Sequence, residues 1–566
     1  MPGIIYVKKM ARHGVLAGVC CAVFLMASGF AINAYAVKAP CLTPPMGWNS
    51  YDSYSYAVTQ AQFMANAHYM ADSLKKYGWE YCIVDFIWWI PQNGRYGNNQ
   101  SSSWSFGRID QYGRFLPDTT RFPSAKGDVG FKALADSVHN LGLKFGIHVM
   151  RGVPRMAARN NTVIYNSTYT CKQAADTTST CSWMDWMWGT NMNSSAGQAY
   201  LNSILELYDS WGVDFIKVDD LSSPYHTAEV AGYASAIASV SREIVLSTSP
   251  GPTPLDTAHH IMQYANQWRL VNDLWDDWNE VKNGLVVAQN WRNKTVNGSI
   301  VAGAGHWPDV DMLPFGHLSF AGFGPVGNPR YSDSLLTKGQ HKVLFFLYCI
   351  SNNPLMWGGN LPDNNHNPFF DSLMMCSEAI FINQHGIKGR VLKSCSSSSP
   401  SIWVSTHPTD TTTKYIYMAD TTNSSLTASV TQNTIGFSST EAVPVYNVWT
   451  KAGLENSTGT FTQTIAAHDA ALFRLGNGTP TSINNVSGIN QNAHFAAEKV
   501  FYTIGNECVI PSSYSGQTIK VSVYDPSGKL LKSVVTRERS IMFDKGNVHG
   551  QKVSIVKISV VNAHGK

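Results

Sequence analysis

The stretch Val213-Asp214-Phe215-Ile216-Lys217-Val218-Asp219-Asp220 decides the fold of this chain. It is a run of β-forming residues that ends in two carboxylates. Side chains alternate between the two faces of a strand, so Phe215, Lys217 and Asp219 share one face. A buried lysine or aspartate is costly unless it is paired or used. Charged groups at the end of an apolar strand therefore predict the catalytic mouth of a (β/α)8 barrel, with a structural ion pair as the alternative.

The surrounding sequence alternates between strand-like and helix-like segments from about residue 45 to residue 385. Strands are predicted at residues 213–219, 268–273 and, more weakly, 300–304, and helices at 197–211 and 228–243. No G-x-G-x-x-G follows the first strand, which disfavours a dinucleotide fold. We therefore expect an α/β chain with a TIM barrel over 37–387, an antiparallel β-sandwich over 388–478 and a small accessory or sorting β-domain over 479–566.

The composition narrows the class of ligand. Charged residues make up 14% of the 566 residues and aromatic residues 12%, with 17 tryptophans. Aromatic-rich, charge-poor surfaces suit sugars, whose C–H faces stack on rings. The net charge of +4 is too small to indicate nucleic-acid binding. The chain has no CxxC and no His-rich spacing, so no metal or other cofactor is expected.

Residues 1–36 have the pattern of a signal peptide. A basic start precedes an apolar run, and Ala34-Tyr35-Ala36 is a small-x-small cleavage site. We expect cleavage after Ala36, no stable membrane insertion thereafter, and a secreted, periplasmic or cell-surface protein; an uncleaved anchor is the alternative. Eight of the ten cysteines would then remain in an oxidising compartment, with Cys171 and Cys181 as the best candidate disulfide.

Five short motifs occur in a fixed order between residues 41 and 385. They are Pro44-Pro45-Met46-Gly47-Trp48-Asn49-Ser50, Lys217-Val218-Asp219, Trp268-Arg269-Leu270-Val271-Asn272-Asp273, Trp307-Pro308-Asp309-Val310-Asp311-Met312 and Gly358-Gly359. Together they resemble glycoside hydrolase family 27 of clan D, which contains α-galactosidases and α-N-acetylgalactosaminidases. The resemblance implies that Asp219 is the nucleophile and Asp273 the acid/base.

The chemistry of glycoside cleavage agrees with that assignment. It needs one ionised carboxylate that attacks and one carboxyl group that donates a proton to the leaving oxygen. Lys217 should keep Asp219 ionised, and on a strand Arg269 would point to the same side as Asp273. We expect retention of configuration, with the two carboxyl groups roughly 5–6 Å apart.

The resemblance also implies a set of sugar-binding residues. Lys217 and Asp85 match residues that contact ring hydroxyls, Arg269 one near the 2-hydroxyl, and Trp48 an aromatic at the pocket wall. Asp311 is expected to organise Arg269. His148 stands where many members have tyrosine, so it contacts the sugar or is a satisfied core histidine.

Two positions depart from the family pattern. Phe86 replaces the second of two aspartates that grip the 4- and 6-hydroxyls, and Ser249 replaces a glutamate that helps to read the 2-hydroxyl. The leading hypothesis is a retaining exo-glycosidase that releases terminal α-D-galactose from oligosaccharides or polysaccharides. The alternatives are a β-L-arabinopyranosidase, an α-N-acetylgalactosaminidase, an α-1,6-glucan hydrolase and, from another class, a non-catalytic carbohydrate-binding protein.

Overall fold

The structure is a computed structural model of the full chain. It describes residues 41–91, 107–320, 330–363, 367–385 and 387–478, and six short strands beyond residue 498. The chain divides into two compact units, Met1–Ile483 and Asn484–Lys566. The predicted signal peptide lies outside the described residues.

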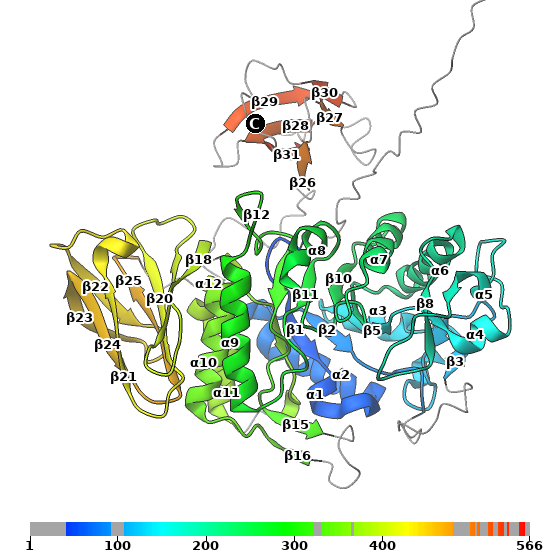
Figure 1. Cartoon of the computed structure of the whole chain (residues 1–566), viewed down its shortest axis with the longest axis horizontal. Helices are drawn as coiled ribbons and strands as arrows, with labels where there is room; N and C mark the ends of the chain where they lie inside the picture. Colours follow the sequence, from blue (N-terminus) through cyan, green and yellow to red (C-terminus); the bar gives the residue numbers. More distant parts are fainter. Residues whose placement is uncertain are drawn as a thin grey trace, which may run out of the picture. The chain divides into compact units, whose positions relative to one another are not determined.

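The first unit contains a parallel eight-stranded sheet that curls into a barrel (Figure 1). Neighbouring strands of the sheet follow one another along the chain, as a (β/α)8 barrel requires. Closure comes from Leu313, which bridges to Trp357 in parallel and donates its N–H to the Met356 carbonyl at 2.6 Å. The strands are β1 (Met46–Asn49), β2 (Tyr81–Val84), β5 (Lys144–Met150), β9 (Phe215–Asp219), β10 (Val245–Thr248), β11 (Gln267–Arg269), β14 (Trp307–Asp309) and β17 (Leu355–Trp357).

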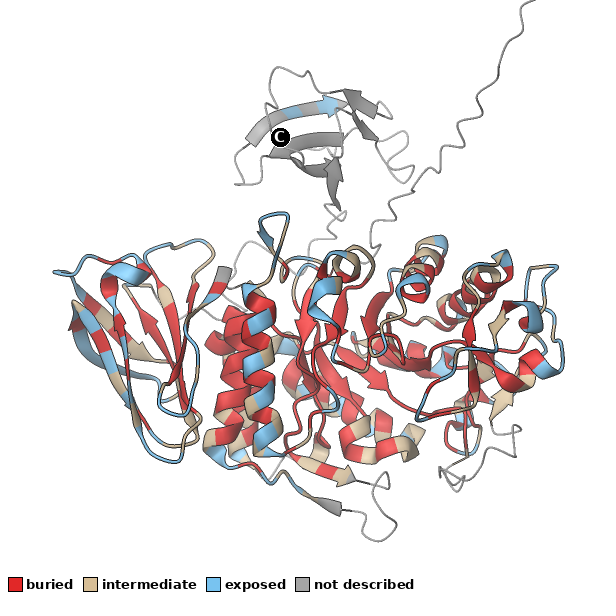
Figure 2. Ribbon diagram, viewed as in Figure 1, coloured by how far each residue is buried: buried red, intermediate tan, exposed pale blue. Residues whose placement is uncertain are grey.

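Two of the helices around the barrel are bounded by clear sequence signals. Helix α6 (Ser195–Trp211) begins after Ser194, whose hydroxyl accepts from the Ala196 N–H, and ends at Gly212 with a φ of 83°. Helix α10 (Lys338–Ser351) begins with a capping box between Thr337 and Gln340. Buried residues concentrate on the strands and on the helix faces turned toward them (Figure 2).

Two of the predicted barrel strands differ from those observed. The weak strand expected at 300–304 is a short hairpin strand, β13 (Ser299–Ile300), paired with β12 (Thr295–Val296), whereas the seventh barrel strand is β14. The sixth strand, β11, ends at Arg269, four residues before Asp273. Asp273 therefore stands in the following loop, and strand alternation does not set its direction.

The β-sandwich packs against the barrel through α10. Its larger sheet has the order β18-β19-β20-β25-β22-β23, and β21 pairs with β24. Tyr417 donates its hydroxyl to the Val343 carbonyl at 3.0 Å, and Lys342 pairs with Asp469 at 2.7 Å. Its strands are β18 (Ile387–Lys393), β19 (Ser401–Thr406), β20 (Lys414–Asp420), β21 (Leu426–Thr431), β22 (Ala442–Asn447), β23 (Ala452–Thr458), β24 (Thr460–Ile465) and β25 (Asp469–Leu475).

The second unit contains an antiparallel sheet of order β26-β31-β28-β29 and the pair β27–β30. Helices in the described part of the chain fall short of the length and apolarity that a membrane crossing needs. The strands are β26 (Lys499–Thr503), β27 (Glu507–Val509), β28 (Ile519–Tyr524), β29 (Leu530–Thr536), β30 (Ser540–Met542) and β31 (Ser554–Val560).

The structure contradicts the predicted disulfide. Cys171 and Cys181 are both buried free thiols. The Cys171 thiol lies 3.6 Å from the Tyr112 carbonyl, whereas Cys181 lies near the Asp220 carboxylate. A spacing of ten residues does not say where the two cysteine side chains point, and in the structure they contact different neighbours.

Candidate active site

Asp219 ends strand β9 and carries a well-supported carboxylate. Its Oδ2 lies 3.0 Å from Nε2 of His148, and its Oδ1 accepts the Asp220 N–H at 3.0 Å. Burial alone would raise the pKa of Asp219, but the His148 hydrogen bond and the charge of Lys217 lower it below its usual range. Its side chain remains 15% exposed, so an ionised oxygen is within reach of a ligand.

His148 lies on the neighbouring strand β5, where its register partner is Lys217. The imidazole is fully buried, and the ring edge of Phe86 packs on it at 5.2 Å between centroids. Among the described residues its Nδ1 has no hydrogen-bond partner, and its Nε2 is bound to Asp219. His148 therefore supports the carboxylate of Asp219; it is buried, as the alternative of a core histidine expected, and its partner is the acid at the end of the next strand.

Lys217 and Asp85 form a buried ion pair on the inner side of the barrel. The Lys217 ammonium lies 3.0 Å from Oδ2 of Asp85, which also accepts from the Asn49 amide at 2.6 Å. Burial opposes ionisation of Asp85, yet Lys217, His148 and the Phe86 N–H together hold its pKa at about 2. The pair therefore presents one fixed anion and one fixed cation, suited to hydroxyl groups.

Arg269 connects the second predicted catalytic carboxylate to the barrel. Its guanidinium contacts Asp311 at 2.6 Å and Asp273 at 3.3 Å. Asp311 Oδ2 also accepts the Leu274 N–H at 2.8 Å, which fixes the loop that carries Asp273. As predicted, Asp311 organises Arg269. The side chain of Asp273 is 64% exposed.

The carboxylates of Asp219 and Asp273 both act electrostatically on the guanidinium of Arg269. Burial would lower the pKa of Arg269, but the charges of Asp311, Asp273 and, more weakly, Asp219 raise it. A single cation thus lies within the field of the two groups that the sequence assigns to catalysis. Asp219, at the end of the fourth strand, and Asp273, in the loop after the sixth, therefore share one electrostatic neighbourhood at the carboxyl ends of the strands.

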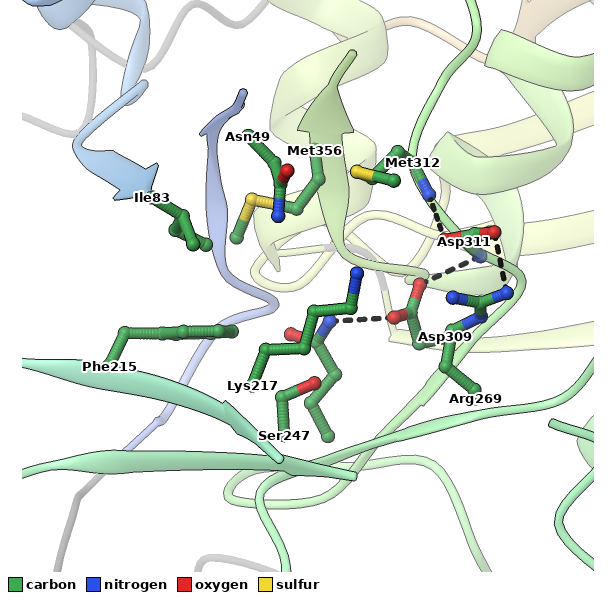
Figure 3. Close-up of a pocket in the computed structure, with 11 residues that line it drawn as sticks. Asn49, Ile83, Phe215, Lys217, Ser247, Arg269, Asp309, Asp311, Met312 and Met356 are labelled. Carbon is green, nitrogen blue, oxygen red and sulfur yellow. Dashed lines mark hydrogen bonds and ion pairs between the residues drawn. The ribbon is translucent and has the colours of Figure 1, made fainter. Parts of the chain in front are cut away.

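A cavity in the barrel interior is lined by Lys217, Arg269 and Asp311 and not by Asp219 or Asp273 (Figure 3). It holds about 290 Å³ of space free of protein atoms, including space open to solvent. The Lys217 ammonium faces it from β9, and the Arg269–Asp311 pair faces it from β11 and from the loop after β14. Its lining is Asn49, Ile83, Phe215, Lys217, Ser247, Gln267, Arg269, Asp309, Asp311, Met312 and Met356. No cluster of three or more metal-ligating side chains occurs among the described residues.

Trp48 is not at the pocket wall. Its indole is fully buried, packs on Phe63 of α2 (Gln60–Tyr69) at 5.7 Å and donates to the Gly359 carbonyl at 2.9 Å. Asn49, the next residue, points into the barrel instead. Both faces of a barrel strand are buried, so the apolar pattern of this short strand does not say which face is internal.

Two residues beside this strand were missed in the sequence. Tyr51 packs against the cluster that contains Met312 and meets Trp275 at 6.2 Å. Asp52 is 1% exposed, and its Oδ2 has no hydrogen-bond partner among the described residues. Burial, reinforced by the charge of Asp311, raises the pKa of Asp52 well above its usual value. Both residues directly follow the Pro44–Ser50 motif, so that position was the available signal.

Comparison with known proteins identifies the family. Residues 184–323 match the model described as alpha galactosidase A, and residues 398–475 match that of the alpha galactosidase C-terminal beta sandwich domain. The solved GH27 β-L-arabinopyranosidase of Geobacillus stearothermophilus, in complex with arabinose, is 35% identical, with a TM-score of 0.72 over 79% of this chain and 100% of that one. The chain belongs to glycoside hydrolase family 27.

This family 27 enzyme is also similar to two proteins that carry other names. A candidate α-N-acetylgalactosaminidase structure from Bacillus halodurans C-125 is 34% identical, with a TM-score of 0.67 over 78% of this chain and 99% of that one. Alpha-galactosidase A of Cellvibrio japonicus is 26% identical over 62% of this chain and 70% of its own length. The family 27 chain is therefore a glycoside hydrolase, as the sequence motifs indicated.

Proposed function

We propose that this family 27 enzyme is a retaining exo-glycosidase for terminal pyranosides with the ring configuration of galactose. The proposal is based on two carboxyl groups, those of Asp219 and Asp273, each held by neighbouring side chains. Asp219 is held ionised by His148 and Lys217, and Asp273 is held by Arg269 across the same neighbourhood. Two such groups are what the double-displacement reaction needs.

In the first step a carboxylate oxygen of Asp219 attacks the anomeric carbon. The glycosidic bond breaks, its electron pair stays on the leaving oxygen, and Asp273 gives that oxygen its proton. In the second step Asp273 takes a proton from water, the water oxygen attacks the same carbon, and Asp219 leaves as a carboxylate. Asp273 is open to solvent, so it can exchange its proton with water between turnovers.

The ring hydroxyls are proposed to meet the Asp85–Lys217 pair. Oδ2 of Asp85 already accepts from Asn49 and Lys217, so the acceptor capacity left for a hydroxyl is on Oδ1, which takes the Phe86 N–H; the Lys217 ammonium has further protons to donate. Arg269 and Ser249, 3.5 Å apart, lie on the other side of the site. These contacts suit a monosaccharide held in one orientation.

One observation favours β-L-arabinopyranosides over α-D-galactosides. The two sugars share a ring configuration, but arabinopyranose lacks the 6-hydroxymethyl group. Phe86, the residue after Asp85, presents a buried apolar ring beside His148 where the family pattern has a second acid. An apolar side chain gives no partner to a 6-hydroxyl, and the loss of such a partner is costly. The similarity to the Geobacillus enzyme supports the same preference.

Aryl glycosides of both sugars test the proposal. We expect hydrolysis of both with retained configuration, and a kcat/KM at least tenfold higher for the arabinopyranoside. Phe86→Asp should raise the relative rate on the galactoside. If the enzyme hydrolysed neither glycoside, the proposed function would be wrong. If the wild-type enzyme preferred the galactoside, the role given to Phe86 would be wrong.

Export is part of the proposal and depends on residues 1–36. The basic start, the apolar run and the Ala34-Tyr35-Ala36 site support removal of a signal peptide. Mass spectrometry of the mature protein from a bacterial host should find Val37 at its N-terminus. An intact N-terminus in the cell pellet would contradict cleavage.

A further inference from the structure

The peptide unit between Asp219 and Asp220 is held at both ends. Its carbonyl oxygen accepts the Arg151 N–H at 3.0 Å, and its N–H donates to Oδ1 of Asp219 at 3.0 Å. Asp220 has a φ of 63°, in the left-handed region that residues other than glycine seldom adopt. Leu221, the next residue, donates its N–H to the Ser249 carbonyl at 2.9 Å. The chain therefore turns directly after the proposed nucleophile, and the turn aims a main-chain donor at its carboxylate.

The side chain of Asp220 is fixed by the same arginine. Its Oδ2 accepts from Nε of Arg151 at 2.8 Å and lies 2.8 Å from Nη2 of the same guanidinium. Both side chains are buried, with 1% of Arg151 and 3% of Asp220 exposed. Arg151 thus binds the turn twice, through its main-chain N–H to Asp219 and through its guanidinium to Asp220.

The guanidinium of Arg151 is in turn anchored to two other parts of the fold. Its Nη1 donates to the Glu229 carboxylate at 2.8 Å and to the Ser179 hydroxyl at 3.1 Å. Glu229 lies on helix α7 (Thr227–Ser239), and its other carboxylate oxygen accepts the Thr190 N–H at 2.7 Å. The guanidinium is therefore held from the helix after the nucleophile strand and from the segment before it.

Stability alone does not account for this arrangement. A buried ion pair seldom stabilises a fold more than apolar residues of the same size would, because both charges must leave water. Burial raises the pKa of Asp220 in spite of the opposing charge of Arg151. The nucleophile gains more: one oxygen of Asp219 is bound by His148 and the other by the Asp220 N–H. The main beneficiary of the network is therefore the carboxylate of Asp219.

We propose that Asp220 and Arg151 are positioning residues for the nucleophile: the guanidinium holds Asp220 so that its N–H fixes the direction of the Asp219 carboxylate. The inference rests on the proposed function, because it takes Asp219 as the group that attacks. A small displacement of a reacting atom slows a reaction strongly. The network should therefore act on the rate of attack and not on the binding of the sugar.

The test measures attack by Asp219 directly. A fluorinated glycoside of the sugar that the wild-type enzyme releases traps the glycosyl-enzyme, and its kinetics give a rate constant for attack and a separate binding constant. Asp220→Gly keeps the main-chain N–H and tolerates the positive φ, but it removes the side chain that Arg151 holds. We expect the rate constant for attack to fall about tenfold or more, with the binding constant changed less than about twofold.

Two conservative variants grade the effect. Asp220→Asn keeps an oxygen that can accept from Arg151, so it should retain more of the rate of attack than Asp220→Gly does. Arg151→Lys keeps a positive charge beside Asp220 and Glu229 but loses the planar fork, so it should slow attack as well.

A matched control separates positioning from stability. Asp110→Asn breaks a similar pair, Asp110 with Arg114 at 2.7 Å, in the segment between the second and third barrel strands. It should lower the melting temperature, as the Asp220 variants do, and leave the rate constant for attack within about twofold of the wild-type value. Melting curves give the folded fraction to which every rate is referred.

The outcomes separate the inference from the proposed function. A wild-type rate of attack in folded Asp220→Gly would overturn the inference, and so would equal losses in Asp220→Gly and Asp110→Asn or a loss confined to the binding constant. Should Asp220→Gly fail to fold, Arg151→Lys decides, and a wild-type rate of attack in that variant overturns the inference. A wild-type enzyme that is labelled elsewhere than at Asp219, or not at all, would instead overturn the proposed function.

Discussion

The hydrogen bond from His148 to Asp219 has a consequence that can be measured. The bond is 3.0 Å long and joins a fully buried imidazole to the carboxylate proposed as nucleophile. A hydrogen bond to a charged group is worth about 1.5–3 kcal/mol, and 1.36 kcal/mol corresponds to one pKa unit. His148→Leu should therefore raise the pKa of Asp219 by about one to two units.

The sign of the effect on activity follows from the mechanism. Asp219 must be ionised to attack, so activity is lost as the pH falls through its pKa, which the native site holds below the usual value. Raising that pKa moves the acidic limb of the kcat/KM profile to higher pH by about one to two units. Near pH 7 Asp219 stays ionised in the variant, so the rate there should fall much less than the rate at acidic pH.

The assay is the pH profile of kcat/KM for an aryl glycoside. His148→Gln is the matched control, because it keeps a side-chain N–H donor and should shift the limb less. A melting curve for each variant separates loss of fold from loss of the hydrogen bond. An acidic limb that coincides in the wild-type enzyme and in folded His148→Leu would refute the reasoning.

Three further predictions concern the fold that holds the site. Lys217→Met leaves Asp85 buried without its cation and should lower the free energy of unfolding, measured by urea denaturation, by about 3–5 kcal/mol. Adding Asp85→Asn to this variant should recover part of the loss. If the losses of the two single variants simply added, the two residues would not be coupled. Gly358→Ala would place a Cβ 2.0 Å from the Asp52 carboxylate and should destabilise by about 1–3 kcal/mol, while Gly303→Ala, with open space around it, should not; equal effects would contradict the packing. The two cysteines of the predicted disulfide should both be alkylated in the denatured protein without reductant, and protection of either would contradict the free thiols.

The fold was predictable because its signals are local and repeated. The charged end of strand 213–219 and the alternation of strands and helices are properties of the residues themselves, and they gave the barrel and the strand that carries Asp219. The seventh strand was missed because Trp307–Asp309 is only three residues long and contains a proline. A segment that short has no periodicity to detect.

The sequence predicts a site residue when its role depends on lying at the carboxyl end of a strand. It does not predict one when the role depends on which face of the strand the side chain points to. Lys217 and Arg269, both singled out from their strands, line the barrel cavity, and Asp85 pairs with Lys217. Trp48 does not line the cavity, because a strand buried on both faces leaves the inward face unmarked. His148 was singled out from the sequence, but its contact with Asp219 depends on the register between β5 and β9, which a single sequence does not contain.

The most direct test of the account is to trap the covalent intermediate. A fluorinated substrate that slows the second step should label the enzyme once, and peptide mass spectrometry should locate the sugar as an ester on Asp219. Asp273→Ala should still accept the label from a glycosyl fluoride, because that leaving group needs no proton. A label on any other residue, or stoichiometric turnover with inverted configuration and no label, would contradict the assignment of Asp219 as nucleophile.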